Sequence, residues 1–183
     1  GCLTGDGLIT HCKISGNQLS NGAAHEGVGV WMSAGRMENC LVDRNRGRAD
    51  GACLIRYPFA LYNVTMTDRN ISEDTQKTSK NFLYDGDTHK APVYNCIVMG
   101  GFASGSRCAE MVVSNCIFSS VATYDSSAEA KWGTYVKKTS DELMLDDDGR
   151  PLPGSPAINF GFNAGVTREA DLDGAQRVYD GTV

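Results

Sequence analysis

The residues best equipped for chemistry lie in the stretch Asp85-Gly86-Asp87-Thr88-His89-Lys90. Two carboxylates, an imidazole and an amine this close together could bind a metal ion or a sugar acid, or exchange protons with a substrate. Asp85, Asp87, His89 and Lys90 are therefore candidate catalytic residues. The simpler interpretation is a solvated turn, because Asp-Gly-Asp is ordinary turn chemistry.

A second group is basic and consists of Arg44, Arg46, Arg48 and Arg69. Arg44 and Arg69 follow Cys40 and Val64 at similar distances, so they could be neighbours on adjacent strands. Guanidinium groups could hold an anionic glycan bidentately, which makes Arg44, Arg46 and Arg69 candidate ligand-binding residues. The alternative is mutual pairing with Asp43, Asp50 and Asp68, a surface network of small net value.

Two acidic segments near the C-terminus supply candidate calcium ligands: Asp146, Asp148, Asp171 and Asp173. Carboxylate oxygens suit Ca²⁺, although the spacing is not that of an EF-hand loop. The alternative is that both segments form turns. Trp31 is a candidate platform for stacking a sugar ring, or else it lies inside the fold or under a loop.

These candidates are set in a repeated pattern. Similar segments recur at Gly7–Asn17, Gly35–Asn45, Phe59–Asn70, Ala91–Gly100 and Glu110–Ser120. Aligned on Cys12, Cys40, Val64, Cys96 and Cys116, they are 28, 24, 32 and 20 residues apart. Such self-similarity indicates a repeat protein in which each unit buries its apolar face against its neighbours.

Each repeat carries two strands. A Gly-led strand, as in Gly27–Met32 and Gly51–Arg56, precedes the Asn-Cys strand, and Gly35 marks the corner between them. Period-2 alternation places the cysteine column in the interior. The opposite column becomes more apolar toward the C-terminus, which suggests that a loop covers the last repeats; it reads Lys13, Leu41, Thr65, Ile97, Ile117.

The polar position before the cysteine predicts a ladder of asparagines that bond the backbone between repeats. Its members are Asn39, Asn63, Asn95 and Asn115, with His11 as a variant in the first repeat.

Repeats that run in one direction give parallel strands, and their connections are right-handed. We therefore predict an all-β fold, a right-handed single-stranded parallel β-helix of roughly five coils. The coils occupy residues 1–121 with an insertion loop at 72–92, and residues 122–183 form a C-terminal capping segment of the same domain. A capping box at Thr139–Glu142 predicts one short helical turn. The chain opens inside a repeat, so further coils are expected before Gly1.

Composition narrows the class of protein. The 183 residues include 17 basic and 22 acidic residues, a net charge of −5, which argues against nucleic-acid binding. No apolar run reaches the ~18–20 residues of a membrane helix. Seven cysteines without a CxxC pair, four of them in one column, favour free packing residues over a disulfide framework.

The segment Asn21–Gly47 resembles the degenerate repeat of right-handed β-helix proteins of the pectin-lyase-like superfamily. GRPLPGSPAINFG (Gly149–Gly161) and DLDGAQR (Asp171–Arg177) resemble the closing segment of large surface proteins of gut and marine bacteria, especially Bacteroidetes. Asn159 stands where those proteins usually have Asp. The resemblance implies a β-helix fold and an exported, cell-surface or extracellular location.

The leading functional hypothesis is an exported module that binds carbohydrate or a host surface without catalysis. One alternative is a polysaccharide lyase or glycoside hydrolase acting on an acidic polysaccharide at the 72–92 insertion. Lyases on this fold use carboxylate-bound Ca²⁺ with Arg or Lys as base. The other alternative is a structural spacer. No cofactor is expected beyond a possible Ca²⁺, and the expected partners are polysaccharides or surface glycans, not nucleic acid.

Overall fold

The chain is built from parallel β-sheets. The computed structural model describes residues 2–3, 7–18, 28–32, 34–47, 53–55, 59–67, 69–72, 82–84, 91–104, 111–123, 132–163, 166 and 169–176. Every pairing between its named strands is parallel. The all-β class with parallel strands, predicted from the repeats, is confirmed.

One sheet has six strands. In spatial order they are β1 (Cys2–Leu3), β4 (Val30–Met32), β7 (Cys53–Ile55), β10 (Phe82–Tyr84), β13 (Phe102–Ser104) and β16 (Val121–Thr123).

The second sheet has nine strands. They are β2 (Leu8–Thr10), β3 (Lys13–Ser15), β5 (Gly35–Asp43), β8 (Phe59–Met66), β11 (Ala91–Tyr94), β12 (Ile97–Val98), β14 (Met111–Ser114), β15 (Cys116–Phe118) and β17 (Tyr135–Lys137). Strands β6 (Arg46–Gly47) and β9 (Ile71–Ser72) form a small third sheet.

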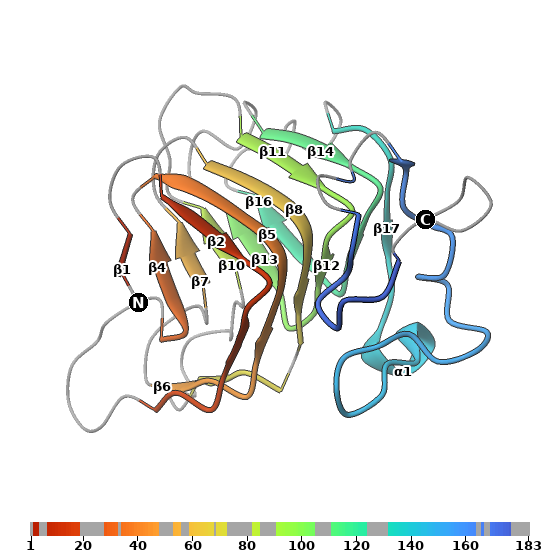
Figure 1. The fold of residues 1–183 in the computed structure, drawn as a ribbon, viewed down its shortest axis with the longest axis horizontal. Helices are drawn as coiled ribbons and strands as arrows, with labels where there is room; N and C mark the ends of the chain where they lie inside the picture. Colours follow the sequence, from red (N-terminus) through yellow and green to blue (C-terminus); the bar gives the residue numbers. More distant parts are fainter. Residues whose placement is uncertain are drawn as a thin grey trace.

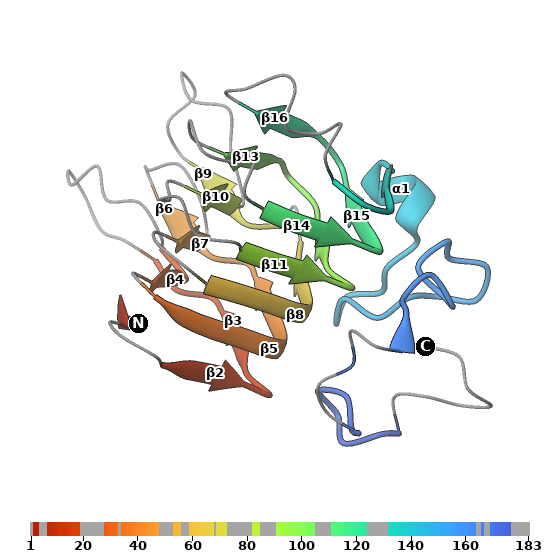
Figure 2. The same ribbon diagram turned by 90° about the horizontal axis from the view of Figure 1, so that it is seen from above.

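The chain alternates between the two larger sheets, which face each other (Figure 1). Strand β4 is followed by β5, β7 by β8 and β10 by β11, so successive strands of one sheet come from successive repeats. Figure 2 shows β2, β5, β8, β11 and β14 side by side in that order. The repeat alignment is therefore the alignment of the strands in space.

The register of the nine-stranded sheet matches the sequence repeat residue by residue. Cys40 pairs with Val64, and the next column runs through paired neighbours: Lys13, Leu41, Thr65, Ile97, Ile117. A one-residue slip would turn the buried column to the other face, so burial of that column fixes the register.

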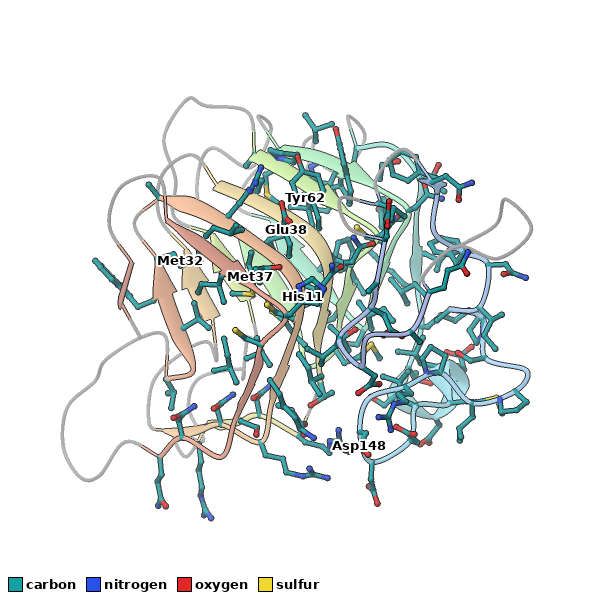
Figure 3. The ribbon with its side chains drawn as sticks, in the orientation of Figure 1. His11, Met32, Met37, Glu38, Tyr62 and Asp148 are labelled. Carbon is teal, nitrogen blue, oxygen red and sulfur yellow. The ribbon has the colours of Figure 1, made fainter. Side chains whose placement is uncertain are left out.

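The hydrophobic core lies between the two sheets. Met32 from β4 and Met37 from β5 are fully buried there (Figure 3). The predicted interior column is part of the same cluster: Cys12, Cys40, Val64, Cys96, Cys116. Burying each large apolar side chain contributes about 1.5–3 kcal/mol, so this shared cluster is the main stabilising feature.

Cysteine recurs in the core column because its thiol has a backbone partner. Each Sγ donates to the carbonyl oxygen two residues earlier, as in Cys40 to Glu38 at 3.1 Å and Cys96 to Tyr94 at 3.2 Å. Cys12, Cys40, Cys96 and Cys116 are free thiols, which confirms the packing interpretation for these four. Val64 fills the same position without such a donor.

The predicted asparagine positions are corners of the backbone. Their φ values lie between 50° and 55°, in the left-handed region: His11, Asn39, Asn63, Asn95, Asn115. Asn and His tolerate this region better than most residues. The left-handed residue shifts the alternation of inward and outward side chains by one position. Met37 and Cys40, three positions apart, therefore both face the core. These five residues are called the corner column below.

Two segments expected to be irregular contain strands. The insertion at residues 72–92 includes β10, which pairs with β7 and β13. Beyond residue 121, β17 pairs in register with β15, so the nine-stranded sheet extends into the predicted capping segment. Strand β17 lacks the Asn-Cys signature, and Tyr135 stands where the earlier repeat has Cys116.

Aromatic residues close the C-terminal end of the core. Phe118, Trp132 and Tyr135 form a cluster with ring centroids 5.7–6.2 Å apart. Tyr135 occupies the register position of Cys116, one strand further on. Larger side chains there fill the space that a further repeat would otherwise occupy.

The C-terminal segment covers the outer column, as its apolar drift predicts. Helix α1 (Ser140–Leu143) begins with the predicted capping box, in which Thr139 and Glu142 bond each other's backbone. Leu143 packs with Met99 and Ile117 in a second apolar cluster, joined by Ile97, Val136, Leu145, Ala157 and Phe160.

Substitution of Gly35 tests the tight turn between β4 and β5. Its φ is +101°, and a Cβ there would lie 2.2 Å from the Gly7 carbonyl oxygen. We expect Gly35→Ala to lower the free energy of unfolding in urea by roughly 3 kcal/mol or more. Gly16→Ala is the control, since φ is +69° with no atom within 4 Å, and its loss should be about 1 kcal/mol. Equal losses would contradict the close approach.

Cys40 gives a test of core burial. Burial raises the pKa of its thiol from 9.0 to about 11. Above the unfolded-state value the unfolded thiol ionises while the folded one stays neutral, so stability should fall as pH rises through this interval. Cys40→Val should keep stability at pH 7 within about 1 kcal/mol and weaken that alkaline loss. Denaturant titrations from pH 7 to 11 measure it, and an unchanged pH dependence would refute it.

Candidate functional site

The side chains of the corner column form hydrogen bonds with the backbone of the C-terminal segment. Asn95 donates to the Phe162 carbonyl at 3.1 Å and accepts from its N–H at 3.0 Å, and Asn115 donates to the Phe160 carbonyl at 2.8 Å. Asn39 reaches the Ala170 carbonyl at 3.4 Å. Within the column, Asn95 Nδ2 donates to Asn63 Oδ1 at 3.2 Å, and Asn39 Nδ2 lies 3.5 Å from His11 Nε2. The side chains of the column mainly bind a distant segment.

A cleft lies between this column and the C-terminal segment, and we call it the amide cleft. It consists of two adjoining cavities of about 350 and 220 Å³, which share Asn63, Thr65, Pro151 and Asp171. The first cavity also contacts Asn95, Asn115 and Phe160. The second also contacts Lys13, Asn39, Asp148, Arg150 and Asp173.

Two cations neutralise two of the carboxylates in the second cavity. Lys13 Nζ lies 2.9 Å from Asp148 Oδ1, and Arg150 binds Asp148 at 3.1 Å and Asp173 at 2.8 Å. Lys13 and then Arg150 lower the pKa of Asp148, and Arg150 lowers that of Asp173. Depressed values stabilise the fold above the usual carboxylate range, and that contribution is lost as pH falls through it.

The candidate calcium ligands form two turns of the same geometry. Asp146 Oδ1 accepts from the N–H groups of Asp148 and Arg150, both at 2.8 Å. Asp171 Oδ1 accepts from Asp173 at 2.9 Å and from the residue after Gly174 at 2.8 Å. Within the described ranges, no group of three or more His, Cys, Asp or Glu side chains is arranged to hold a metal ion.

Two of the three arginine candidates, Arg44 and Arg69, are brought together, and both are engaged in ion pairs. Arg69 Nε lies 2.8 Å from Asp43 Oδ1, and Arg44 Nη1 lies 3.2 Å from Oδ2 of the same buried carboxylate. Thr67 donates to Asp43 as well. Arg44 also donates to the Asp147 carbonyl at 3.1 Å. The pairing alternative therefore describes Arg44 and Arg69 better than a glycan site does.

The remaining candidates are apart from this group. Arg46 is exposed in β6, and its backbone N–H donates to the Asn17 carbonyl at 2.8 Å. Trp31 is half-buried in β4, between the buried core residues Val30 and Met32, so it faces outward. Asp85, Asp87, His89 and Lys90 lie outside the described residues.

Sequence reasoning missed a row of side chains on the outer face of the nine-stranded sheet. Glu38 pairs with Tyr62, and Tyr62 with Tyr94, whose rings lie 5.6 Å apart edge to face. Figure 3 shows Glu38 and Tyr62 on this face. Glu38 is 1% exposed and lies 2.9 Å from Arg36 Nε. Burial is the main cause that raises the pKa of Tyr62. In the sequence, these residues are marked only by their position, because Glu38, Tyr62 and Tyr94 each stand directly before a residue of the corner column.

Comparisons with family models, curated proteins and solved structures give no match for this chain. No helix in the described part is long and apolar enough to span a membrane. The geometry of the amide cleft is therefore the basis for inferring a function.

The buried carboxylate of Asp43 gives a matched test of the arginine pairing. Asp43→Asn should lower the free energy of unfolding by about 2–3 kcal/mol, because it removes charge-assisted bonds from Arg69 and Arg44. Asp147→Asn should cost less than about 1 kcal/mol, since Asp147 is fully exposed. Chemical denaturation measures both, and equal losses would show that the Asp43 bonds contribute little.

Proposed function

We propose that the protein is a right-handed parallel β-helix of pectin-lyase-like type, exported and displayed at the cell surface, that binds carbohydrate in the amide cleft without catalysis. The alternation of the chain between two parallel sheets supports the β-helix, and right-handed connections are the rule for parallel strands. The export and the superfamily assignment are supported by the resemblance of the repeat and the closing segment.

The observation that carries the binding proposal is the lining of the cleft. Amide side chains follow one another along its wall, opposite carboxylates and backbone groups of the C-terminal segment. The amide Nδ2 groups are bonded to the C-terminal segment, but an amide oxygen accepts up to two hydrogen bonds, so this wall can still accept bonds from sugar hydroxyls. The larger cavity, about 350 Å³, falls within the ~300–1,000 Å³ range of small-molecule sites.

Binding without catalysis is supported by the state of the acidic groups in the cleft. Asp148 and Asp173 are paired with Lys13 and Arg150, and Asp171 accepts two backbone N–H bonds within its turn. A general acid would need a raised pKa, whereas the pKa values of Asp148 and Asp173 are lowered.

A glycan array probed with the whole chain tests the proposal, followed by titration calorimetry on the best ligand, with Ca²⁺ and with a chelator. Thr65→Trp places a large ring where the two cavities meet and should weaken binding at least about tenfold. Val112→Trp, on the outer face of β14, is the control and should bind like the wild type. Loss of binding in the presence of the chelator would show that Ca²⁺ takes part in ligand binding.

Binding that survives Thr65→Trp would place the ligand elsewhere, for instance at Trp31. No binding to any glycan would favour the structural spacer. The enzyme alternative, a polysaccharide lyase or glycoside hydrolase, predicts turnover of an acidic polysaccharide that is lost in the Asp85→Asn, Asp87→Asn double variant while its thermal unfolding is unchanged.

A further inference from the structure

One buried acceptor in the amide cleft has no hydrogen-bond partner among the residues that the structure describes. Asn39 is 1% exposed and lines the second cavity. Its Nδ2 group donates to the Ala170 carbonyl, whereas its Oδ1 atom accepts no hydrogen bond in the structure. A buried carbonyl oxygen without a donor costs free energy, so this atom favours a ligand that brings a hydroxyl or amine.

The charges around this acceptor restrict the ligand. The second cavity contains three carboxylates, Asp148, Asp171 and Asp173, against two cations, Lys13 and Arg150. Both cations are held by aspartates: Lys13 by Asp148, and Arg150 by Asp148, Asp173 and, at 3.9 Å, Asp146. Among the described residues, no cation forms an ion pair with Asp171. An anionic ligand would therefore meet an uncompensated carboxylate, whereas a hydroxyl could donate to it.

We propose that the second cavity binds the hydroxyl groups of a neutral sugar and rejects uronic acids. One hydroxyl donates to Asn39 Oδ1 and another to the Asp171 carboxylate. The carboxylate of a uronate is excluded by repulsion from Asp171, because Lys13 and Arg150 are already engaged. This inference rests on the proposed carbohydrate-binding function and specifies its ligand class.

Asp146 is a control residue for Asp171. Asp146 sits in a turn of the same geometry as that of Asp171, and it contacts neither cavity of the amide cleft. In both turns the structural bonds are accepted by Oδ1, which an asparagine side chain also provides. Asp171→Asn and Asp146→Asn are therefore matched variants that remove one charge each and keep the turn.

The test uses oligosaccharides of one neutral hexose and of the corresponding hexuronic acid, matched in length and linkage, with affinity measured by titration calorimetry. The wild type should bind the neutral series and bind the uronate series at least about tenfold more weakly. Asp171→Asn should weaken neutral binding by about tenfold, the loss of one charge-assisted hydrogen bond, and strengthen uronate binding. Asp146→Asn should change both affinities by less than about twofold, because Arg150 keeps its shorter pairs with Asp148 and Asp173.

Asn39→His provides a second readout that does not depend on the turn. Histidine stands at the equivalent, more exposed corner in His11, with φ 52°, so the backbone conformation accepts it, and thermal unfolding of the variant checks the buried position. Because His lacks the carbonyl acceptor, neutral binding should fall about threefold to tenfold, with uronate binding still weak.

Two failures are distinguishable. Equal affinity for both series in the wild type, unchanged by Asp171→Asn and by Asn39→His, would overturn the neutral-sugar inference and leave the proposed function standing. Absence of binding to either series, and to every glycan on the array, would overturn both.

Discussion

A left-handed backbone corner, repeated at the same place in five repeats, is the constraint on which the rest of the structure depends. It lets the residues on either side of it, such as Met37 and Cys40, both face the core although they are an odd number of positions apart, and it points one polar side chain per repeat outward. Because parallel strands stack about 4.8 Å apart, the corners line up into a column. The core on one side and the amide cleft on the other follow from the same residues.

The edge of the sheet beyond the cleft is held by a different arrangement. Asn45 accepts from Asn17 at 2.8 Å, and Asn70 accepts from Asn45 at 3.0 Å, one repeat after another. Beside them Asp43 binds arginines from two repeats. These bonds satisfy polar groups that the stacking buries, and a buried carboxylate is tolerated only with such partners. Arg69 therefore helps to hold adjacent repeats together at this edge, and Arg44 pairs with the same carboxylate.

Much of this fold could be predicted from the sequence, because the repeat itself encodes the register. The cysteine column, the outer column from Lys13 to Ile117 and the capping box at Thr139 are where the pattern places them. Strand β17 was not predicted because Tyr135 stands where the earlier repeat has Cys116, and β10 lies within the segment that was predicted as a loop. A pattern search detects similarity, whereas packing requires only that the volume be filled.

The candidate site was harder to predict, for a physical reason. The partners of Asn95 and Asn39 lie 67 and 131 residues further along the chain, and nothing local in the sequence marks such pairs. Local charge patterns pointed instead to the arginines and the aspartates, whose charges are mostly satisfied by one another. The burial of Glu38 and the missing partner of Asn39 Oδ1 are properties of the folded environment alone.

Because the corner column binds the C-terminal segment at fixed positions, the length of that segment is matched to the number of repeats. Phe160, Phe162 and Ala170 each meet the corner of a different repeat, in the reverse of the order in which the repeats stack. Inserting or deleting one repeat would displace these contacts by one strand spacing and put them out of phase. Natural variation in length should therefore be confined to the loops between strands, unless the closing segment changes with it.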